Sequence, residues 1–414
     1  MNLTDTAATA GEPPGPTRAL LDVRDPRAWV ALDLDTRAAL RRAYLWGGAR
    51  EPEPLAPVLG ERALAVALCH ADGRTRETAV RRAADCPALL PLVAIRCTDW
   101  AAPVRRRAFA LLRTALPALP VGAFCDVAAV VLRVAPRHRG GPALALVEQQ
   151  LHGAEAEFVA GCLAAPDRLV QRLAARVVIG RGLFTPLRLA GAAATGADIA
   201  VQDRFAQAAA ASLPGEAAEE EVAAVLALLL GSRQPRVRAT GVTALNRLGL
   251  PARAEPFLAD RAPIVRACAR WVLRQHGGDP LPRYRELCAD PDRLERTTAA
   301  APAGLGECGE RADAALLRPL LAHPLPQVRA QAVVGLRALD VTTVDALLPL
   351  VDDPAAAVVR AATEALLPSA DRLPEPWFAE RLAEGVAHPT RIAATRLRQA
   401  GRRHLGPYGH RPAP

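Results

Sequence analysis

Residues 323–336 read His-Pro-Leu-Pro-Gln-Val-Arg-Ala-Gln-Ala-Val-Val-Gly-Leu, and this stretch decides the fold of the chain. An apolar segment ends in a turn that contains His323 and proline. The pair Val328-Arg329 then opens a second segment, in which Ala and Leu follow at helical spacing. The stretch therefore predicts two short helices joined by a turn.

The same pattern recurs along most of the sequence. Clear copies of the Val-Arg pair begin at Val104, Val237, Val265, Val328 and Val359. Weaker copies begin at Thr75, Val170, Val201, Leu294 and Thr390, with a degenerate copy near residue 138. Successive markers are 28 to 36 residues apart, and a period of about 31 residues holds two short helices and two turns. Because one such hairpin cannot bury its apolar face alone, the hairpins must stack, which predicts an all-α α-solenoid.

The composition favours the same fold class. About half of the residues are hydrophobic (51%), and Ala, Leu and Val dominate, whereas aromatic residues make up 4%. Ala and Leu are strong helix formers, and strand patterns of period two are hard to find. At 414 residues the chain is too long for one ordinary core. A repeat array accommodates this length because its core grows by stacking.

The pattern divides the chain into four predicted segments. Residues 1–19 are expected to be a disordered leader, and residues 405–414 a disordered tail. Residues 60–404 carry the repeats. Residues 20–59 match the repeat poorly, and we expect them to form an N-terminal helical cap. Its large aromatic residues would cover the open end of the array: Trp29, Tyr44 and Trp46.

The turn, the Val-Arg pair and the following Ala and Leu resemble the HEAT repeat over roughly residues 60–402. The period near 31 is most similar to the short bacterial HEAT-like repeats first associated with phycobilin lyases (PBS-lyase type). The resemblance implies a superhelical array of about 10–11 HEAT-like helical hairpins. It also implies that the recurring Arg and the turn Asp form a ladder of structural contacts between repeats: Asp99, Arg105, Arg238, Arg266, Arg329 and Arg360. Solenoids host many functions, so the resemblance predicts the fold rather than the activity.

Positive charge is concentrated at one end of the sequence. All 52 basic residues are Arg, against 43 acidic residues, which gives a net charge of +9. A GC-rich genome replaces Lys with Arg, so the abundance of Arg alone does not indicate nucleic-acid binding. Residues 36–139 hold 17 Arg and 8 acidic residues and so carry the whole excess. A basic end favours an acidic partner there, with partly solvated structural arginines as the alternative.

The turn at Asp99 and Trp100, followed by Arg105, Arg106 and Arg107, is the first candidate site. Three consecutive cations around a helix cannot all face the core, so at least one is solvated. Their position near a positive helix end costs about a few tenths of a kcal/mol, which a bound anion would offset. We therefore predict a partner-binding site at Trp100 and the three arginines. The alternative is an ordinary charged helix face.

Trp271 is the centre of the second candidate site. The equivalent position is Ala110 in one repeat and Thr243 in another, so it is not deep core. Arg270 and Arg274 flank the tryptophan, and Trp with Arg is typical of binding hot spots. We predict that these three residues contact a partner, with packing against the next repeat as the alternative.

Several function classes lack their sequence signatures. The eight Cys form no CxxC pair and share no short window with paired His, so zinc spacing is absent. We expect buried free thiols in a reducing cytoplasm. No signal peptide and no apolar run of membrane-spanning length occurs. No nucleotide-binding, hydrolase or metalloprotease motif is found. The sequence predicts no catalytic residue, no metal site and no cofactor.

We therefore expect a cytoplasmic, non-enzymatic scaffold. The second helices would line a concave face that binds another protein with an acidic surface, without contact to a membrane. The alternative is nucleic-acid binding, as in the HEAT-like alkylpurine DNA glycosylases, which have a basic concave face with Trp and a carboxylate. Asp99 and Trp100 are adjacent in one turn, which does not reproduce a carboxylate facing aromatics across a groove. A phycobilin-lyase activity would rest on the repeat type alone.

Overall fold

The computed structural model describes residues 25–45, 60–213 and 219–404. Helices are the only regular elements in these ranges, and the predicted all-α class is confirmed. The predicted leader and tail lie outside the described residues, as do Trp46 and the side chain of Tyr44. The proposed bounds of the four segments stay predictions.

The chain forms two compact units, residues 1–208 and 209–414. The first unit holds α1 (Pro26–Leu45), α2 (Glu61–Leu68), α3 (Gly73–Arg82), α4 (Leu90–Arg96), α5 (Ala102–Ala115), α6 (Val121–Val134), α7 (Gly141–Gly153), α8 (Ala156–Leu163), α9 (Arg168–Gly180), α10 (Pro186–Thr195) and most of α11 (Ile199–Ala211). The second holds α12 (Glu219–Leu230), α13 (Pro235–Arg247), α14 (Pro263–Gln275), α15 (Leu281–Ala289), α16 (Ala301–Cys308), α17 (Ala314–Leu317), α18 (Pro326–Ala338), α19 (Val344–Leu347), α20 (Ala356–Leu366), α21 (Glu375–Leu382) and α22 (His388–His404). Short 3₁₀ helices complete several repeats, among them η5 (Pro251–Ala259), η8 (Pro319–Ala322) and η9 (Leu348–Asp352).

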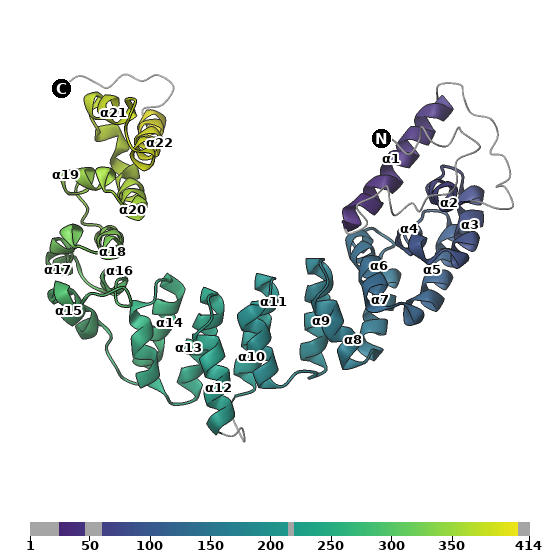
Figure 1. The fold of residues 1–414 in the computed structure, drawn as a ribbon, viewed down its shortest axis with the longest axis horizontal. Helices are drawn as coiled ribbons and strands as arrows, with labels where there is room; N and C mark the ends of the chain where they lie inside the picture. Colours follow the sequence, from purple (N-terminus) through teal and green to yellow (C-terminus); the bar gives the residue numbers. More distant parts are fainter. Residues whose placement is uncertain (1–24, 46–59, 214–218, 405–414) are drawn as a thin grey trace. The chain divides into compact units, whose positions relative to one another are not determined.

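Within each unit, most consecutive helices pack as hairpins (Figure 1). Within the first unit α2 pairs with α3, α4 with α5, and α8 with α9; within the second, α12 pairs with α13 and α21 with α22. Second helices also pack on each other: α3 packs on α5, α16 packs on α18, and α18 packs on α20. Their facing residues include fully buried small and branched side chains such as Ala108, Val237 and Ala269. The predicted α-solenoid of stacked hairpins is confirmed.

Proline interrupts the first helix in several repeats. Pro319 begins η8 directly after α17, and Pro349 lies in η9 directly after α19. Proline has no N–H to continue the α-helical ladder, so the chain tightens into a 3₁₀ turn there. The second helices are longer and more regular, and they carry the recurring arginines.

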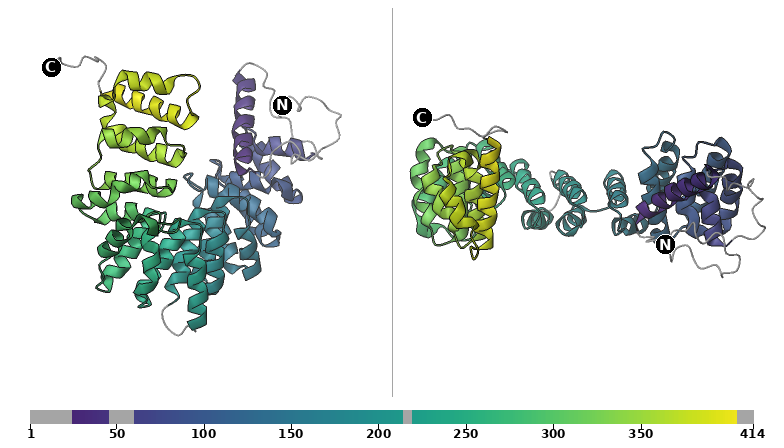
Figure 2. Two further views of the ribbon diagram at one scale, coloured as in Figure 1. Left: turned by 60° about the vertical axis from the view of Figure 1, so that its left-hand side comes forward. Right: turned by 90° about the horizontal axis from the view of Figure 1, so that it is seen from above.

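The N-terminal helix α1 packs on helices that follow the first hairpin. It packs on α4 and α6, and Trp29 is 2% exposed beside Pro91 and Val127. Figure 2 shows α1 in purple beside the blue helices of the first unit. Burying this large aromatic residue removes apolar surface from water. Trp29 lies against α4 and α6, and its predicted covering of the open end stays a prediction.

Two of the predicted repeat markers are out of register. Residues 294–300 form no helix, and the second helix of that repeat, α16, begins only at Ala301. Arg360 is the other case. In α18 the N–H of Arg329 bonds the carbonyl of the N-cap residue Leu325, whereas in α20 the corresponding bond is made by Val359. Arg360 therefore lies one residue too late, and one residue turns the side chain by about 100° around the helix.

Candidate partner-binding site

The recurring arginine occupies the fourth residue of the second helix and joins two repeats. In three repeats its Nε and Nη2 donate to both carboxylate oxygens of the aspartate in the next turn, at 2.8 Å in each case: Arg76 to Asp99, Arg238 to Asp260 and Arg329 to Asp353. The Nη1 of each arginine donates to two carbonyls of its own turn, as Arg329 does to His323 and Pro324. Each guanidinium thus fixes its own turn and the next one.

The ladder aspartates also begin the helix that follows them. One carboxylate oxygen accepts the N–H of the residue two positions on, from Ala101 for Asp99 and from Ala355 for Asp353. Burial raises the pKa of Asp353, but the hydrogen bonds from Arg329 and from the Ala355 N–H outweigh burial and lower the pKa overall. His323 replaces aspartate in one turn, and its Nδ1 accepts the Leu325 N–H in the same way.

Three predicted ladder residues depart from this geometry. Arg105 donates to the Asp99 carbonyl but has no acidic partner among the described residues. Arg266 donates from Nη1 to the Asp260 carbonyl, but its acidic partner is Glu307 of α16 instead of a turn aspartate. The next turn is displaced because residues 294–300 form no helix. Arg360 is exposed and makes no side-chain hydrogen bond or ion pair with any residue that the structure describes. Its predicted ladder role is wrong, since Val359 occupies the inward position.

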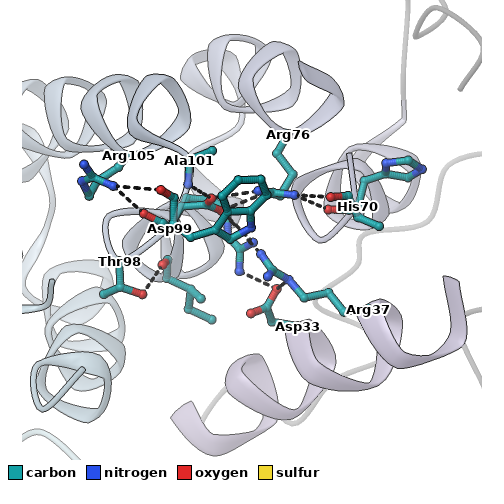
Figure 3. Close-up of polar contacts among 12 residues, drawn as sticks. Asp33, Arg37, His70, Arg76, Thr98, Asp99, Ala101 and Arg105 are labelled. Carbon is teal, nitrogen blue, oxygen red and sulfur yellow. Dashed lines mark hydrogen bonds and ion pairs between the residues drawn. The ribbon is translucent and has the colours of Figure 1, made fainter. Parts of the chain in front are cut away.

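Asp99 has more arginine partners than Asp260 or Asp353, and Figure 3 shows its contacts. Its side chain is fully buried, and besides Arg76 it accepts weaker contacts from Arg37 of α1 at 3.5 Å and Arg96 of α4 at 3.4 Å. Arg37 and Arg96 also pair with Asp33 of α1. Burial raises the pKa of Asp33, against the lowering effect of Arg37. The cluster joins α1, α3 and α4 beneath the turn that carries Trp100.

Trp100 projects from that turn and is 67% exposed, with the Arg76 guanidinium 5.5 Å from its ring centre. Three further guanidinium groups contact the turn through neutral acceptors. Arg105 donates to the Asp99 carbonyl at 2.7 Å, Arg139 to the Trp100 carbonyl at 3.2 Å, and Arg137 to the Thr98 hydroxyl at 3.3 Å. We call Trp100, Arg105, Arg137 and Arg139 the Trp100 surface.

The Trp100 surface holds arginines that form no direct ion pair with a described carboxylate, although the charge of Arg137 acts on the buried Asp33. Arg137 and Arg139 are exposed and Arg105 is half-buried, and none of the three pairs with a carboxylate among the described residues. Each guanidinium keeps N–H groups that a carboxylate could accept. An exposed indole beside such cations is the composition of a binding hot spot.

The other two arginines of the first candidate site differ. Arg106 is exposed on α5, and its side chain makes no contact of this kind within the described part of the chain. Arg107 pairs with Glu77 of α3 at 3.0 Å, across neighbouring second helices. Arg106 is therefore the accessible member of this pair, and Arg107 is already neutralised.

Two of the three residues of the second candidate site are exposed, and the third is buried. Trp271 is 42% exposed, and Arg274 is exposed one turn further along α14. Arg270 is buried, and it donates to Glu307 at 2.7 Å and contacts the Tyr284 hydroxyl at 3.4 Å. The predicted partner contact of Arg270 is wrong, because α16 brings Glu307 onto this face of α14.

Sequence reasoning missed Arg137 and Arg139, which lie between α6 and α7. The degenerate repeat marker near residue 138 hid them, since no Val-Arg pair marks the turn. Arg37 and Asp33 were also missed, because α1 does not follow the repeat. For Arg137 and Arg139 the sequence did offer a signal, the run Arg-His-Arg directly after an apolar segment.

The described residues hold no group of His, Cys, Asp and Glu suited to a metal ion, and no described helix is long and apolar enough to cross a membrane. Five of the cysteines are buried and three are half-buried, all as free thiols. Asp99 is covered by Arg76, Arg37 and Arg96. A carboxylate held this way is unavailable to activate a water at an open groove.

No family model matches the chain, and no curated protein matches it. Solved structures similar to it include the karyopherin Kap121p bound to the extreme C-terminus of the protein phosphatase Cdc14p, at 15% identity and a TM-score of 0.34 over 91% of this chain and 49% of that one. A mutant of Kap121p gives 15% identity and a TM-score of 0.31 over 87% and 47%. Importin beta in an ammonium sulfate condition gives 12% identity and a TM-score of 0.28 over 98% and 66%. The chain spans about half the length of these Kap121p structures, which are HEAT-repeat proteins, and the likeness concerns the fold alone.

Proposed function

We propose that this chain is a non-enzymatic, cytoplasmic scaffold of the short bacterial HEAT-like type that binds a protein with an acidic surface. The observation that carries the proposal is the Trp100 surface. An indole that is 67% exposed lies beside three arginines without a carboxylate partner in the described ranges. Burying the indole removes apolar area from water, and partner carboxylates would complete the hydrogen bonding of the guanidinium groups.

The position of the turn supports the proposal further. Residues 98–100 each accept a hydrogen bond from an arginine, and the Asp99 side chain is held by Arg76 from below. A surface fixed in this way loses little conformational freedom on binding, so more of the contact energy is available for affinity. Rigid display of a few anchors is what a scaffold requires.

Arg106, Trp271 and Arg274 are proposed as additional contacts. All three are exposed on second helices, Arg106 on α5 and the other two on α14. We propose that the second helices line the concave face on which the partner lies. Arg107 would contribute less, because its ion pair with Glu77 must break first.

Affinity capture of the full chain from its host, with mass spectrometry of the retained proteins, tests the proposal. Trp100→Ala and the double variant Arg137→Gln/Arg139→Gln should lose the partner, because truncating a hot-spot residue costs about 2 kcal/mol or more. Arg360→Gln is the matched control, since Arg360 is exposed and unpaired with any described residue. If all three variants retain the same amount of partner, the assignment of this surface is overturned.

Nucleic acid is the competing outcome of the same experiment. If DNA or RNA is retained in place of protein, its affinity must fall steeply with salt, because phosphate contacts release counterions. Steep salt dependence with loss of binding in Arg137→Gln/Arg139→Gln would replace the protein partner with a nucleic acid.

A further inference from the structure

A groove in the first unit lies between α1, α6 and α9, and it encloses about 750 Å³. Residues 27, 30, 31 and 34 of α1 line it, which places them on one stripe of that helix. The adjacent stripe, with Trp29 and Asp33, is buried against α4 and α6. Helix α1 therefore covers the array with one stripe and leaves the next stripe open to the groove.

The groove has an apolar lining that the chain leaves exposed. Leu34 of α1 is 56% exposed and Leu169 of α9 is 37% exposed, with Val30 half-buried beside them. Single exposed leucines are common on protein surfaces. Leu34 and Leu169 come from helices far apart in the sequence but line the same groove, so one apolar face of a partner can cover both.

The rim of the groove is positive. Arg133 is neutralised by Asp167 at 2.6 Å, and Arg172 by Asp198 at 2.9 Å. Two more arginines, Arg27 and Arg168, are exposed, and their guanidinium groups make no hydrogen bond or ion pair with a described residue. The groove thus has two unneutralised cations beside its exposed leucines, so the complementary surface is apolar and acidic.

We propose that this groove docks an acidic amphipathic helix of a protein partner. Leucine-like side chains at i, i+3 and i+7 would cover Leu34 and Leu169, and flanking carboxylates would pair with Arg27 and Arg168. The proposal rests on the proposed function, since it names the kind of segment that the scaffold holds. It adds a second contact region to the Trp100 surface. Helix α1 serves both, because Arg37 reaches Asp99 while Leu34 lines the groove.

A synthetic helical peptide with Leu at i, i+3 and i+7 and Glu elsewhere is the probe, measured by fluorescence anisotropy with the full chain. The Leu34→Glu/Leu169→Glu variant should abolish binding, because it puts two carboxylates against an acidic ligand. Arg27→Gln/Arg168→Gln should weaken binding about tenfold, the effect of two partly exposed ion pairs. A peptide with Gln in place of Glu should bind the wild-type chain more weakly by about the same factor. Leu187→Glu and Arg204→Gln are the matched controls, since both residues are exposed on neighbouring helices.

A charge exchange separates direct pairing from a change in folding. Arg27→Glu/Arg168→Glu should reject the Glu peptide and bind a peptide in which Lys replaces Glu. The inference is overturned if the groove variants bind the Glu peptide as tightly as the wild type does. It is also overturned if the Gln and Glu peptides bind the wild type equally. Self-association that Leu34→Glu abolishes would assign the groove to a second copy of the chain instead. If the groove variants keep the captured partner while Trp100→Ala loses it, the groove inference fails and the proposed function stands.

Discussion

Arg329 and Asp353 lie 24 residues apart in the sequence, and the guanidinium of one forms two hydrogen bonds of 2.8 Å with the carboxylate of the other. Arg76 with Asp99 and Arg238 with Asp260 repeat this geometry at separations of 23 and 22 residues. The same relationship thus links successive hairpins in both units. It also positions the turn on which Trp100 lies, so the stability of the array and the shape of the candidate site depend on the same kind of ion pair.

Replacing Arg329 with Gln should destabilise the chain. The side chain of Asp353 is 7% exposed and would lose its charged partner, while the turn carbonyls at His323 and Pro324 would lose their donor. Removing one member of a buried pair costs about 3 kcal/mol, somewhat less here because Arg329 is 14% exposed. Urea denaturation followed by circular dichroism measures the change. Arg360→Gln should stay within about 0.5 kcal/mol of the wild type, and a loss as large as that of Arg329→Gln would contradict the ladder register.

Gly335 should not tolerate alanine. A Cβ at this position in α18 would lie 2.4 Å from the Pro302 carbonyl oxygen of α16, where the two second helices meet. Forcing the helices apart costs about 1–3 kcal/mol, measured as a lower midpoint of urea denaturation. Gly191→Ala in the middle of α10 is the opposite case, because a Cβ there meets nothing within 4 Å. It should stabilise the chain by about 0.5–1 kcal/mol, and equal effects of both changes would contradict this packing.

Stability should fall in acid. The hydrogen bond from Arg172 lowers the pKa of Asp198, and the one from Arg285 lowers the pKa of Asp313, from the ordinary value of 3.8. The unfolded chain therefore takes up these protons first. The stabilisation is fully present above that value and is lost as the pH falls through the lower folded pKa. Asp33, whose pKa is raised, acts in the opposite direction.

Denaturation midpoints measured between about pH 6 and pH 3 test this dependence. Arg172→Gln should be less stable at neutral pH and lose less on acidification, because Asp198 loses the hydrogen bond that lowers its pKa most. A variant as sensitive to acid as the wild type would show that this pair does not set the acid response.

Partner binding through the Trp100 surface should depend moderately on salt. Arg105, Arg137 and Arg139 offer three cations, and exposed charge pairs are screened as ionic strength rises. The indole contact is not screened, so binding of a protein partner should weaken without vanishing at high salt. Surface plasmon resonance of the captured partner at several salt concentrations measures this. Trp100→Ala should lower affinity by about the same factor at every salt concentration, whereas Arg137→Gln/Arg139→Gln should weaken binding most at low salt and so also reduce the salt dependence.

The sequence determined the repeat unit and most of its internal contacts. Apolar spacing and turns are local properties, and a Val-Arg pair at a fixed distance after a turn determines which arginine side chain faces that turn. The ladder role of Arg238 and Arg329 was implied by the HEAT resemblance, and the structure shows the corresponding pairs with Asp260 and Asp353. The argument failed at Arg360, where the extra residue after the turn moves the arginine around the helix and gives its place to Val359.

Only the tertiary structure decided which arginines are free. Arg270 and Arg274 look equivalent in the sequence, yet Glu307 of α16 buries the first and leaves the second exposed. Arg137 meets Thr98 and Arg139 meets Trp100 because the end of α6 lies beside the turn before α5, 39 residues earlier. Leu34 and Leu169 line one groove although they belong to α1 and α9. Helical periodicity places a side chain on a face, but the packing of distant helices determines what that face meets.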